Sequence, residues 1–289
     1  MSYPELQRGD QGEGVFQLQS FLNRVGAMLN ADGDFGPSTE RGVLYAQDYG
    51  GQPVTGRAQG PLWTWLETIP EPFPALDTNG LAFIALEETG GLAYYSTNTQ
   101  WPHFPGEASG ITIGVGYDLR MNTEEDFLAT WGNVLPEGVL AELTRDVGKR
   151  GTKTRARELR QLGITVPFKA AWPVFVEKTM PRYYADTKAI YPSLSRLDGL
   201  CRSVLVSLVF NRGNDLKGKR RREMREIQAI LKEADREGLD EEQITSILAR
   251  VEDQIVSMKR LWDPGSGLIK RRQAEANLWR AGLARRQTG

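Results

Sequence analysis

Apolar residues recur at helical spacing near the N-terminus. In GVFQLQSFLNRVG, Gly26 ends the segment and five apolar residues recur at helical spacing: Val15, Leu18, Phe21, Leu22 and Val25. This pattern predicts an amphipathic helix over residues 14–26.

Two further helices are predicted in the first 70 residues. A turn at Asp32-Gly33 precedes Pro37, which suits the first turn of a helix that continues through Gln47. A third, shorter helix is predicted to hold Leu62, Trp63, Trp65 and Leu66. Three such helices make only a small core, so residues 1–70 are expected to form an accessory binding domain rather than an enzyme.

Prolines separate these helices from the rest of the chain. Residues 66–80 read LETIPEPFPALDTNG, and prolines at alternate positions favour an extended connector that cannot continue a helix. We therefore predict a proline-rich linker at residues 71–79 and a second domain at residues 80–289.

The second domain opens with NGLAFIALEETGG. Leu81, Ile84, Ala85 and Glu88 stand at i, i+3, i+4 and i+7, which places Glu88 within an apolar stripe before two glycines end the helix. Burial favours the protonated carboxyl, as a general acid near neutral pH requires. Glu87 lies roughly 100° around the helix and is the alternative, and an ordinary solvated helix end remains the simpler interpretation of the pair.

Most of the remaining pattern is helical. DEEQITSILARVEDQIVSMKRLW starts with an N-cap at Asp240 and keeps its apolar residues on one face. RSVLVSLVFNRG is typical of a buried helix, and GLIKRRQAEANLWRAGLARR of a basic terminal helix. The predicted fold class is mainly α: a small three-helix domain, then an α+β domain with a small β region and a helical lobe.

The strongest strand pattern is GITIGVGYDL at residues 110–119. Alternation places Thr112, Gly114, Gly116 and Asp118 on one face and the apolar residues on the other. In a straight strand Thr112 and Asp118 would be separated by roughly 20 Å. Both can serve one site only if the chain turns at Gly114 or Gly116, and a glycine-rich hairpin without chemistry is the alternative.

Composition narrows the possible chemistry. The chain has 289 residues, of which 40% are hydrophobic and 25% charged, as in an ordinary globular protein. One histidine, His103, is too few for a typical zinc hydrolase, and it lies in WPHFP without a nucleophile motif nearby. One cysteine, Cys201, stands among apolar residues and is expected to be a buried structural thiol. Any catalysis should therefore depend on carboxylates, with no metal or cofactor.

Charge is distributed unevenly. Residues 1–75 contain 4 basic and 9 acidic residues, although the net charge of the chain is only −1. The basic segment LKGKRRREMR at 216–225 is either a solvated face or a surface that attracts an anionic wall or membrane. Net charge does not indicate nucleic acid as a partner, and no run approaches the ~18 apolar residues of a membrane span. We expect a monomer without stable membrane insertion.

The N-terminal segment resembles the peptidoglycan-binding domain of cell-wall hydrolases. The resemblance rests on LQRGDQGEGVFQLQSFLN and ADGDFGPSTERGVLYAQ, which cover about residues 6–66. It implies cell-wall binding through Asp32, Phe35 and Thr39. The alternative is that the residues of this DG-x-FG turn only build the turn and the core.

The second domain resembles the phage lysozyme superfamily, and the segment SGITIGVGYDL is most similar to its pesticin-like branch. FNRG and GLIKRRQAE support the resemblance, which covers about residues 78–280. It implies Glu88 as general acid, with Thr112 and Asp118 as threonine and second carboxylate. It also implies substrate binding by Trp101, Tyr117 and Asn211. Between residues 89 and 111 the one acid is Glu107, so the second carboxylate must follow the TIG segment.

Together the two resemblances imply a modular phage endolysin. They imply an N-acetylmuramidase that cleaves the β-1,4 bond between N-acetylmuramic acid and N-acetylglucosamine in the peptidoglycan of Gram-negative bacteria. The N-terminus has no secretory leader, so we expect synthesis in the host cytoplasm and action in the periplasm after release by a holin. The alternatives are a lytic transglycosylase, a bacterial toxin or effector muramidase, and a non-catalytic wall-binding protein.

Overall fold

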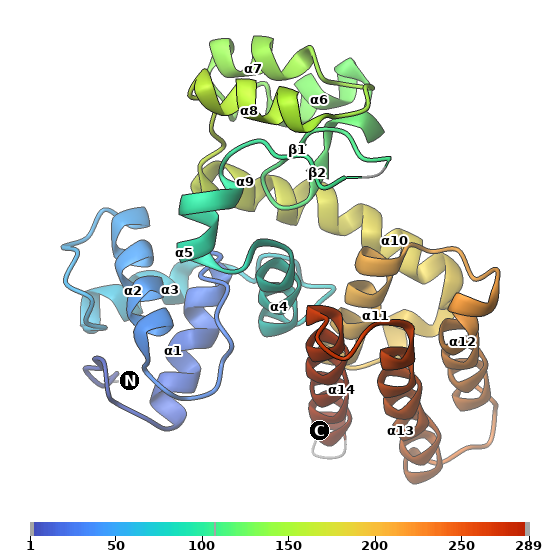
Figure 1. Ribbon diagram of the computed structural model, residues 1–289. Coiled ribbons are helices and arrows are strands. Elements are labelled where there is room, and N and C mark those ends of the chain that lie inside the picture. Colours follow the sequence, from blue (N-terminus) through green and yellow to red (C-terminus); the bar gives the residue numbers. More distant parts are fainter. Residues whose placement is uncertain (1–2, 107, 287–289) are drawn as a thin grey trace. The chain divides into compact units, whose positions relative to one another are not determined.

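The computed structural model describes residues 3–106 and 108–286, and over these residues it is mostly helical with one two-stranded antiparallel sheet (Figure 1). The predicted mainly α fold class is confirmed. Glu107 lies outside the described residues.

Along the chain, one group of helices comes before a short β-hairpin and a second group follows it. The helices are α1 (Glu13–Arg24), α2 (Pro37–Tyr49), α3 (Gly60–Thr68), α4 (Thr78–Thr89), α5 (Leu92–Tyr94), α6 (Glu124–Trp131), α7 (Glu137–Thr144), α8 (Lys153–Gln161), α9 (Phe168–Val174), α10 (Met180–Ile190), α11 (Gly199–Arg212), α12 (Arg222–Ala234), α13 (Glu241–Ser257) and α14 (Gly267–Arg286). The strands are β1 (Thr112–Ile113) and β2 (Tyr117–Asp118).

Packing divides the chain into two compact units. The first unit contains the residues up to 72 together with 82–180, and the second contains 73–81 together with the residues from 181 onward. The three N-terminal helices therefore pack with the middle of the chain. The proline-rich segment is divided between the units, because Pro70 and Pro72 belong to the first and Pro74 belongs to the second. The limits predicted for the two functional domains, 1–70 and 80–289, stay a prediction.

The N-terminal helices form as their apolar spacing predicts. The core between α1, α2 and α3 is built from fully buried side chains, among them Val15, Leu18, Leu22, Phe35, Val43 and Trp63. Residues 82–180 of the same unit cover one side of these helices. The indole Nε1 of Trp172 donates to the carbonyl of Arg24 over 3.3 Å, and the rings of Tyr45 and Phe168 lie 5.9 Å apart.

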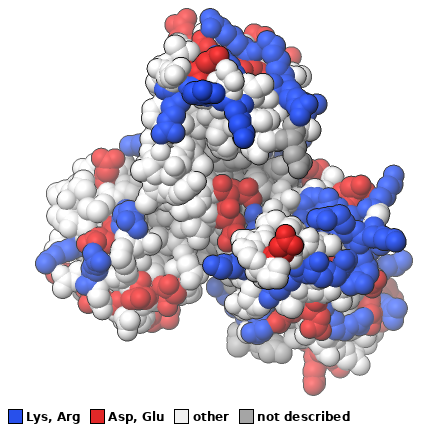
Figure 2. Space-filling view, in the orientation of Figure 1, with Lys and Arg blue, Asp and Glu red and all other residues white. Residues whose placement is uncertain are grey.

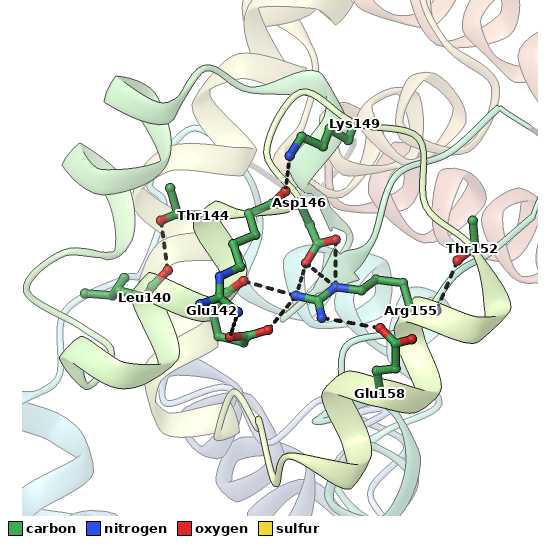
Figure 3. Close-up of polar contacts among 9 residues, drawn as sticks. Leu140, Glu142, Thr144, Asp146, Lys149, Thr152, Arg155 and Glu158 are labelled. Atoms are coloured by element: carbon green, nitrogen blue, oxygen red, sulfur yellow. Dashed lines mark hydrogen bonds and ion pairs between the residues drawn. The ribbon is translucent and has the colours of Figure 1, made fainter.

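A network of ion pairs joins α7 to α8 in the first unit. The guanidinium of Arg155 donates to both oxygens of Asp146 at 3.0 Å and to Glu142 at 2.7 Å (Figure 3). The hydrogen bond from Arg155 lowers the pKa of the Glu142 carboxyl, and partial desolvation opposes this shift. Because α8 buries only Leu159, this network and the Thr152 N-cap supply much of what holds the helix in place.

The second unit is built around the buried helix α11. Val204, Leu205 and Leu208 of this helix are fully buried, and α12, α13 and α14 contribute further apolar side chains to the same core. The predicted cap of α13 is confirmed, because Asp240 and Gln243 form a reciprocal capping box. Cys201 is buried as predicted.

Two arginines of α14 share one buried carboxylate. The Glu275 side chain is fully buried and lies 2.7 Å from Arg272 Nε and 3.4 Å from Arg271 Nε. The Ser207 hydroxyl of α11 donates to the same carboxylate over 2.6 Å. The cluster fixes α14 against α11.

Within the described ranges, no helix combines the length and the apolar character needed to cross a lipid bilayer.

Candidate functional site

The glycine-rich segment folds back on itself as a hairpin. Thr112 of β1 pairs with Asp118 of β2, and the two glycines between them have φ angles of +56° and +71°. The chain is therefore not a straight strand between Thr112 and Asp118. The turn at Gly114 and Gly116, identified as the condition for one shared site, is present. Directly opposed residues of an antiparallel pair have Cβ atoms about 5 Å apart on the same face of the sheet.

The apolar face of the hairpin is buried as predicted. Ile111, Ile113 and Val115 are at most 2% exposed. Gly114 lies against Trp131 of α6, where an added Cβ would meet the indole at 3.1 Å. The Tyr117 ring packs edge-on against the same indole, with centroids 5.5 Å apart. Both Gly114 and Tyr117 therefore anchor the turn to α6, and any contact of Tyr117 with substrate stays a prediction.

The carboxylate of Asp118 is fixed by backbone donors. Its two oxygens accept from the Gly110 N–H at 3.0 and 3.1 Å, and Oδ1 also accepts from the Arg120 N–H at 2.9 Å. A Cβ at position 110 would lie only 2.4 Å from Asp118 Oδ1. The strand pattern alone does not reveal this requirement for Gly110. The side chain is half-buried and held in one direction, as a positioned carboxylate requires.

His103, which the sequence pattern does not link to this site, is a neighbour of the pair Thr112 and Asp118. Its backbone exchanges two hydrogen bonds with Thr112, of 3.0 and 2.8 Å, on the edge opposite Asp118. His103, Thr112 and Asp118 are therefore successive partners across three short extended segments and share one face. Burial lowers the pKa of the His103 imidazole below its ordinary value of 6.5, and a hydrogen bond with the Trp101 carbonyl opposes this shift. The imidazole is therefore mostly neutral at pH 7.

Glu88 lies in the last turn of α4. Its side chain is half-buried whereas that of Glu87 is exposed, which agrees with the face predicted from apolar spacing. Gly90 and Gly91 end the helix with φ angles of +76° and +87°. The Thr89 hydroxyl bonds to the Ala85 carbonyl at 2.7 Å and to the sulfur of Met28, in the loop after α1, at 3.1 Å. The end of α4 that bears Glu88 is thus held from within the first unit.

The other predicted substrate contacts lie on different elements. Trp101 precedes the hairpin and stacks with the Arg160 guanidinium, whose centre lies 5.1 Å from the ring. Asn211 lies near the C-terminal end of α11, in the second unit, and is half-buried. The roles of Trp101 and Asn211 stay predictions.

The predicted wall-binding residues surround Gln19. Its amide donates to Asp32 Oδ1 at 2.9 Å and to Thr39 Oγ1 at 3.0 Å, and its oxygen accepts from the Gly33 N–H at 2.8 Å. Phe35 is fully buried and Thr39 is 3% exposed. These two residues therefore act on a ligand only through the shape of the turn, whereas Asp32 is exposed. Binding of the wall by the three residues stays a prediction.

No metal site is apparent in the part of the chain that the structure describes. No three side chains of His, Cys, Asp or Glu gather there in a way that could hold an ion. Around the hairpin, carboxylate, hydroxyl and imidazole groups can transfer protons and form hydrogen bonds.

Comparisons with known proteins give one functional similarity. Residues 11–66 match the model of a family described as "Putative peptidoglycan binding domain", within the predicted domain 1–70. No curated protein matches the chain. The crystal structure of the Burkholderia AP3 phage endolysin matches over 99% of this chain and 100% of that chain, at 16% identity and a TM-score of 0.22. This TM-score is too low to show that the two chains share a fold. The N-terminal resemblance to peptidoglycan-binding domains is thus confirmed at the level of the family.

Proposed function

We propose that this protein is a peptidoglycan hydrolase that binds the cell wall through its N-terminal helices and cleaves the glycan with groups of α4 and the hairpin. The observation that carries the catalytic part is the register of the hairpin, which sets Thr112 opposite a half-buried, backbone-held Asp118. The family match at residues 11–66 supports the cell wall as the substrate.

The reaction proposed is hydrolysis of the β-1,4 bond from N-acetylmuramic acid to N-acetylglucosamine. Glu88 protonates the leaving oxygen as that bond breaks. Water adds to the anomeric carbon and loses a proton, with Asp118 and Thr112 positioning it or accepting the proton. The carboxylate of Asp118 also offsets positive charge that develops on the sugar.

One observation favours a second candidate, a lytic transglycosylase. Both oxygens of Asp118 already accept backbone hydrogen bonds, as expected of a carboxylate that only shapes the loop. Glu88 would then act alone, first as acid and then as base for a hydroxyl of the same sugar. The product would be an anhydro sugar instead of a reducing end.

Mass spectrometry of digested peptidoglycan separates the two reactions. Hydrolysis adds one water for each bond broken and leaves reducing N-acetylmuramic acid, whereas transglycosylation leaves 1,6-anhydro ends. Anhydro ends alone would contradict the muramidase proposal. Absence of any soluble product would favour a non-catalytic wall-binding protein.

The assignment of the acid is tested with matched neutral variants of two neighbouring residues. Glu88→Gln is expected to lower turnover by about 10²- to 10⁴-fold or more, because it removes the proton donor and keeps the shape of the side chain. Glu87→Gln is the control, since that side chain is exposed on the same helix turn. Loss of activity in Glu87→Gln with a fully active Glu88→Gln would contradict the assignment.

Wall binding is tested with the full chain. A Glu88→Gln protein should co-sediment with purified insoluble peptidoglycan and not with cellulose particles. Equal recovery on the two polymers would contradict the binding role of the N-terminal helices.

The biological setting proposed is a phage endolysin that acts, as a monomer, on Gram-negative peptidoglycan in the periplasm after holin release. A bacterial toxin or effector with the same chemistry is the alternative. Genes for a holin and for phage structural proteins beside this one would favour the endolysin, and an adjacent immunity gene would favour the toxin.

A further inference from the structure

A basic pocket lies in the second unit, between the end of α11, the loop before α12 and the start of α14. Its volume is about 540 Å³. No Asp or Glu is found among the described residues that line it. Five of the lining residues are basic: Arg212, Lys217, Lys219, Arg220 and Arg221. Asn211 and Trp262 add an amide and an aromatic wall. Figure 2 shows lysine and arginine side chains gathered over the unit that contains α11–α14.

Arg212 is the buried cation of this pocket. It is only 9% exposed, and its Nε is buried without a hydrogen-bond partner. Its guanidinium lies 5.3 Å from the centre of the Trp262 ring and donates to the Arg220 carbonyl. Burial is the largest cause that lowers the pKa of Arg212 to about 10, and the nearby positive charges of Arg221 and Arg272 add to it. A buried cation without an adjacent carboxylate is destabilising until an anion reaches it.

Glu223, which acts electrostatically on Arg212, is engaged by other arginines. Glu223 is fully buried and receives Arg260 at 2.7 Å and Arg222 at 3.0 Å. Glu275 is shared by the two arginines of α14. The pocket therefore keeps a positive charge that these carboxylates do not neutralise.

The loop that forms one wall of the pocket is held in place by arginine side chains that donate to backbone carbonyls. Arg225 donates to the carbonyls of Leu216 and Gly218 at 2.7 and 2.9 Å. Arg221 of the following turn donates to the Arg212 carbonyl. A site whose walls are fixed before binding loses little conformational entropy when a ligand enters.

We propose that this pocket binds the free carboxylates of the peptide stems of peptidoglycan, a ligand class that follows from the proposed function. A guanidinium and a carboxylate are planar and pair through two parallel hydrogen bonds. The volume lies within the range of sites for small molecules and suits one or two amino-acid residues rather than a polymer strand. An anionic membrane is flat and would meet the exposed lysines, but it could not enter a hollow to reach a buried guanidinium.

The test is binding of a defined probe by the full-length protein. The probe is the synthetic tripeptide L-Ala-γ-D-Glu-meso-diaminopimelic acid, and its counterpart with every carboxylate amidated is the ligand control. Calorimetry should detect the free tripeptide and not the amidated one. Arg212→Met should weaken binding by about 10- to 100-fold, the range expected for loss of a hydrogen-bonded charge.

A second variant keeps the test decisive if Arg212→Met does not fold. Lys217→Gln/Arg220→Gln removes two exposed charges of the pocket, and Lys188→Gln/Lys232→Gln removes two exposed charges elsewhere in the same unit. The pocket variant should lose at least about tenfold in affinity and the control variant none. Equal affinity in both variants, or equal binding of the amidated tripeptide, would overturn the proposal.

Two further measurements distinguish peptide binding in the pocket from membrane binding and from glycan hydrolysis. Binding of anionic phospholipid vesicles that depends on the pocket residues, without binding of the tripeptide, would identify a membrane surface and overturn the proposal. Tripeptide binding by a protein that cleaves no glycan would sustain the pocket and reject the hydrolase. Glycan cleavage with tripeptide binding unaffected by the pocket variant would sustain the hydrolase and reject the pocket.

Discussion

Substituting Glu275 by Gln should strongly destabilise the second unit. Gln keeps the size of the side chain and one oxygen for the Ser207 hydroxyl, but it removes the negative charge that Arg271 and Arg272 share. These side chains are at most 3% exposed, so water cannot replace the lost charge. Removing one partner of a buried pair costs about 3–5 kcal/mol, and we expect a loss of free energy of unfolding in that range.

The matched control is Glu252→Gln in α13. Glu252 pairs with Arg280, another arginine of α14, but the Arg280 side chain is 65% exposed. Exposed ion pairs contribute about 0–1 kcal/mol, so this variant should unfold almost as the parent does. The two variants make the same chemical change against the same helix and differ in burial.

Urea unfolding followed by tryptophan fluorescence measures both variants, because Trp262 and Trp279 report on this unit. Hydrogen exchange in α11 and α14 separates local opening from unfolding elsewhere in the chain. The double variant Glu275→Gln/Arg272→Met should be less destabilised than the sum of its single variants, since each change removes a charge that the other leaves behind. A loss below about 1 kcal/mol for Glu275→Gln, equal to that of the control, would refute the reasoning.

Three further predictions concern the hairpin, the histidine and the cysteine. Gly110→Ala should displace Asp118 and lower both activity and stability, the latter by about 1–3 kcal/mol; Gly138→Ala, which meets no atom within 4 Å, is the control, and equal melting temperatures would contradict the prediction. The NMR signal of His103, the one histidine of the chain, should titrate below the ordinary pKa of 6.5 in the folded protein. The unfolded chain then binds more protons between these two pKa values, so stability should rise with pH across that interval, and a folded pKa above 6.5 would contradict the assignment. Burial raises the pKa of Cys201, which is 1% exposed, so a thiol reagent should label it only as fast as the protein opens; immediate labelling of the native protein would be the opposite result.

The helices that the sequence predicts best are those with one apolar face. The spacing of Val15, Leu18 and Leu22 and the cap at Asp240 are local features, and both were confirmed. By contrast α8 has one buried side chain and no apolar stripe to detect. Its position depends on Arg155 meeting acids 9 and 13 residues away, a contact that periodicity does not report.

The candidate site was predictable as far as it is local. The turn between Thr112 and Asp118 follows from the glycines between them. The pairing of His103 with Thr112 depends on how a segment outside the strand pattern folds back, and the bond from Gly110 to Asp118 depends on how the hairpin closes. The pocket around Arg212 depends on side chains that α11, the following loop and Trp262 bring together.

The contact between the N-terminal helices and residues 82–180 limits how freely the wall-binding part can be exchanged. Removing residues 1–70 would uncover the aromatic rings of Phe168 and Trp172. It would also remove the Met28 sulfur from the Thr89 hydroxyl, one residue after Glu88. A transplanted binding domain would therefore have to reproduce a hydrophobic surface as well as an affinity for the wall. The two parts of this protein are a matched pair, and a chimaera that ignores that surface should aggregate before its wall specificity can be measured.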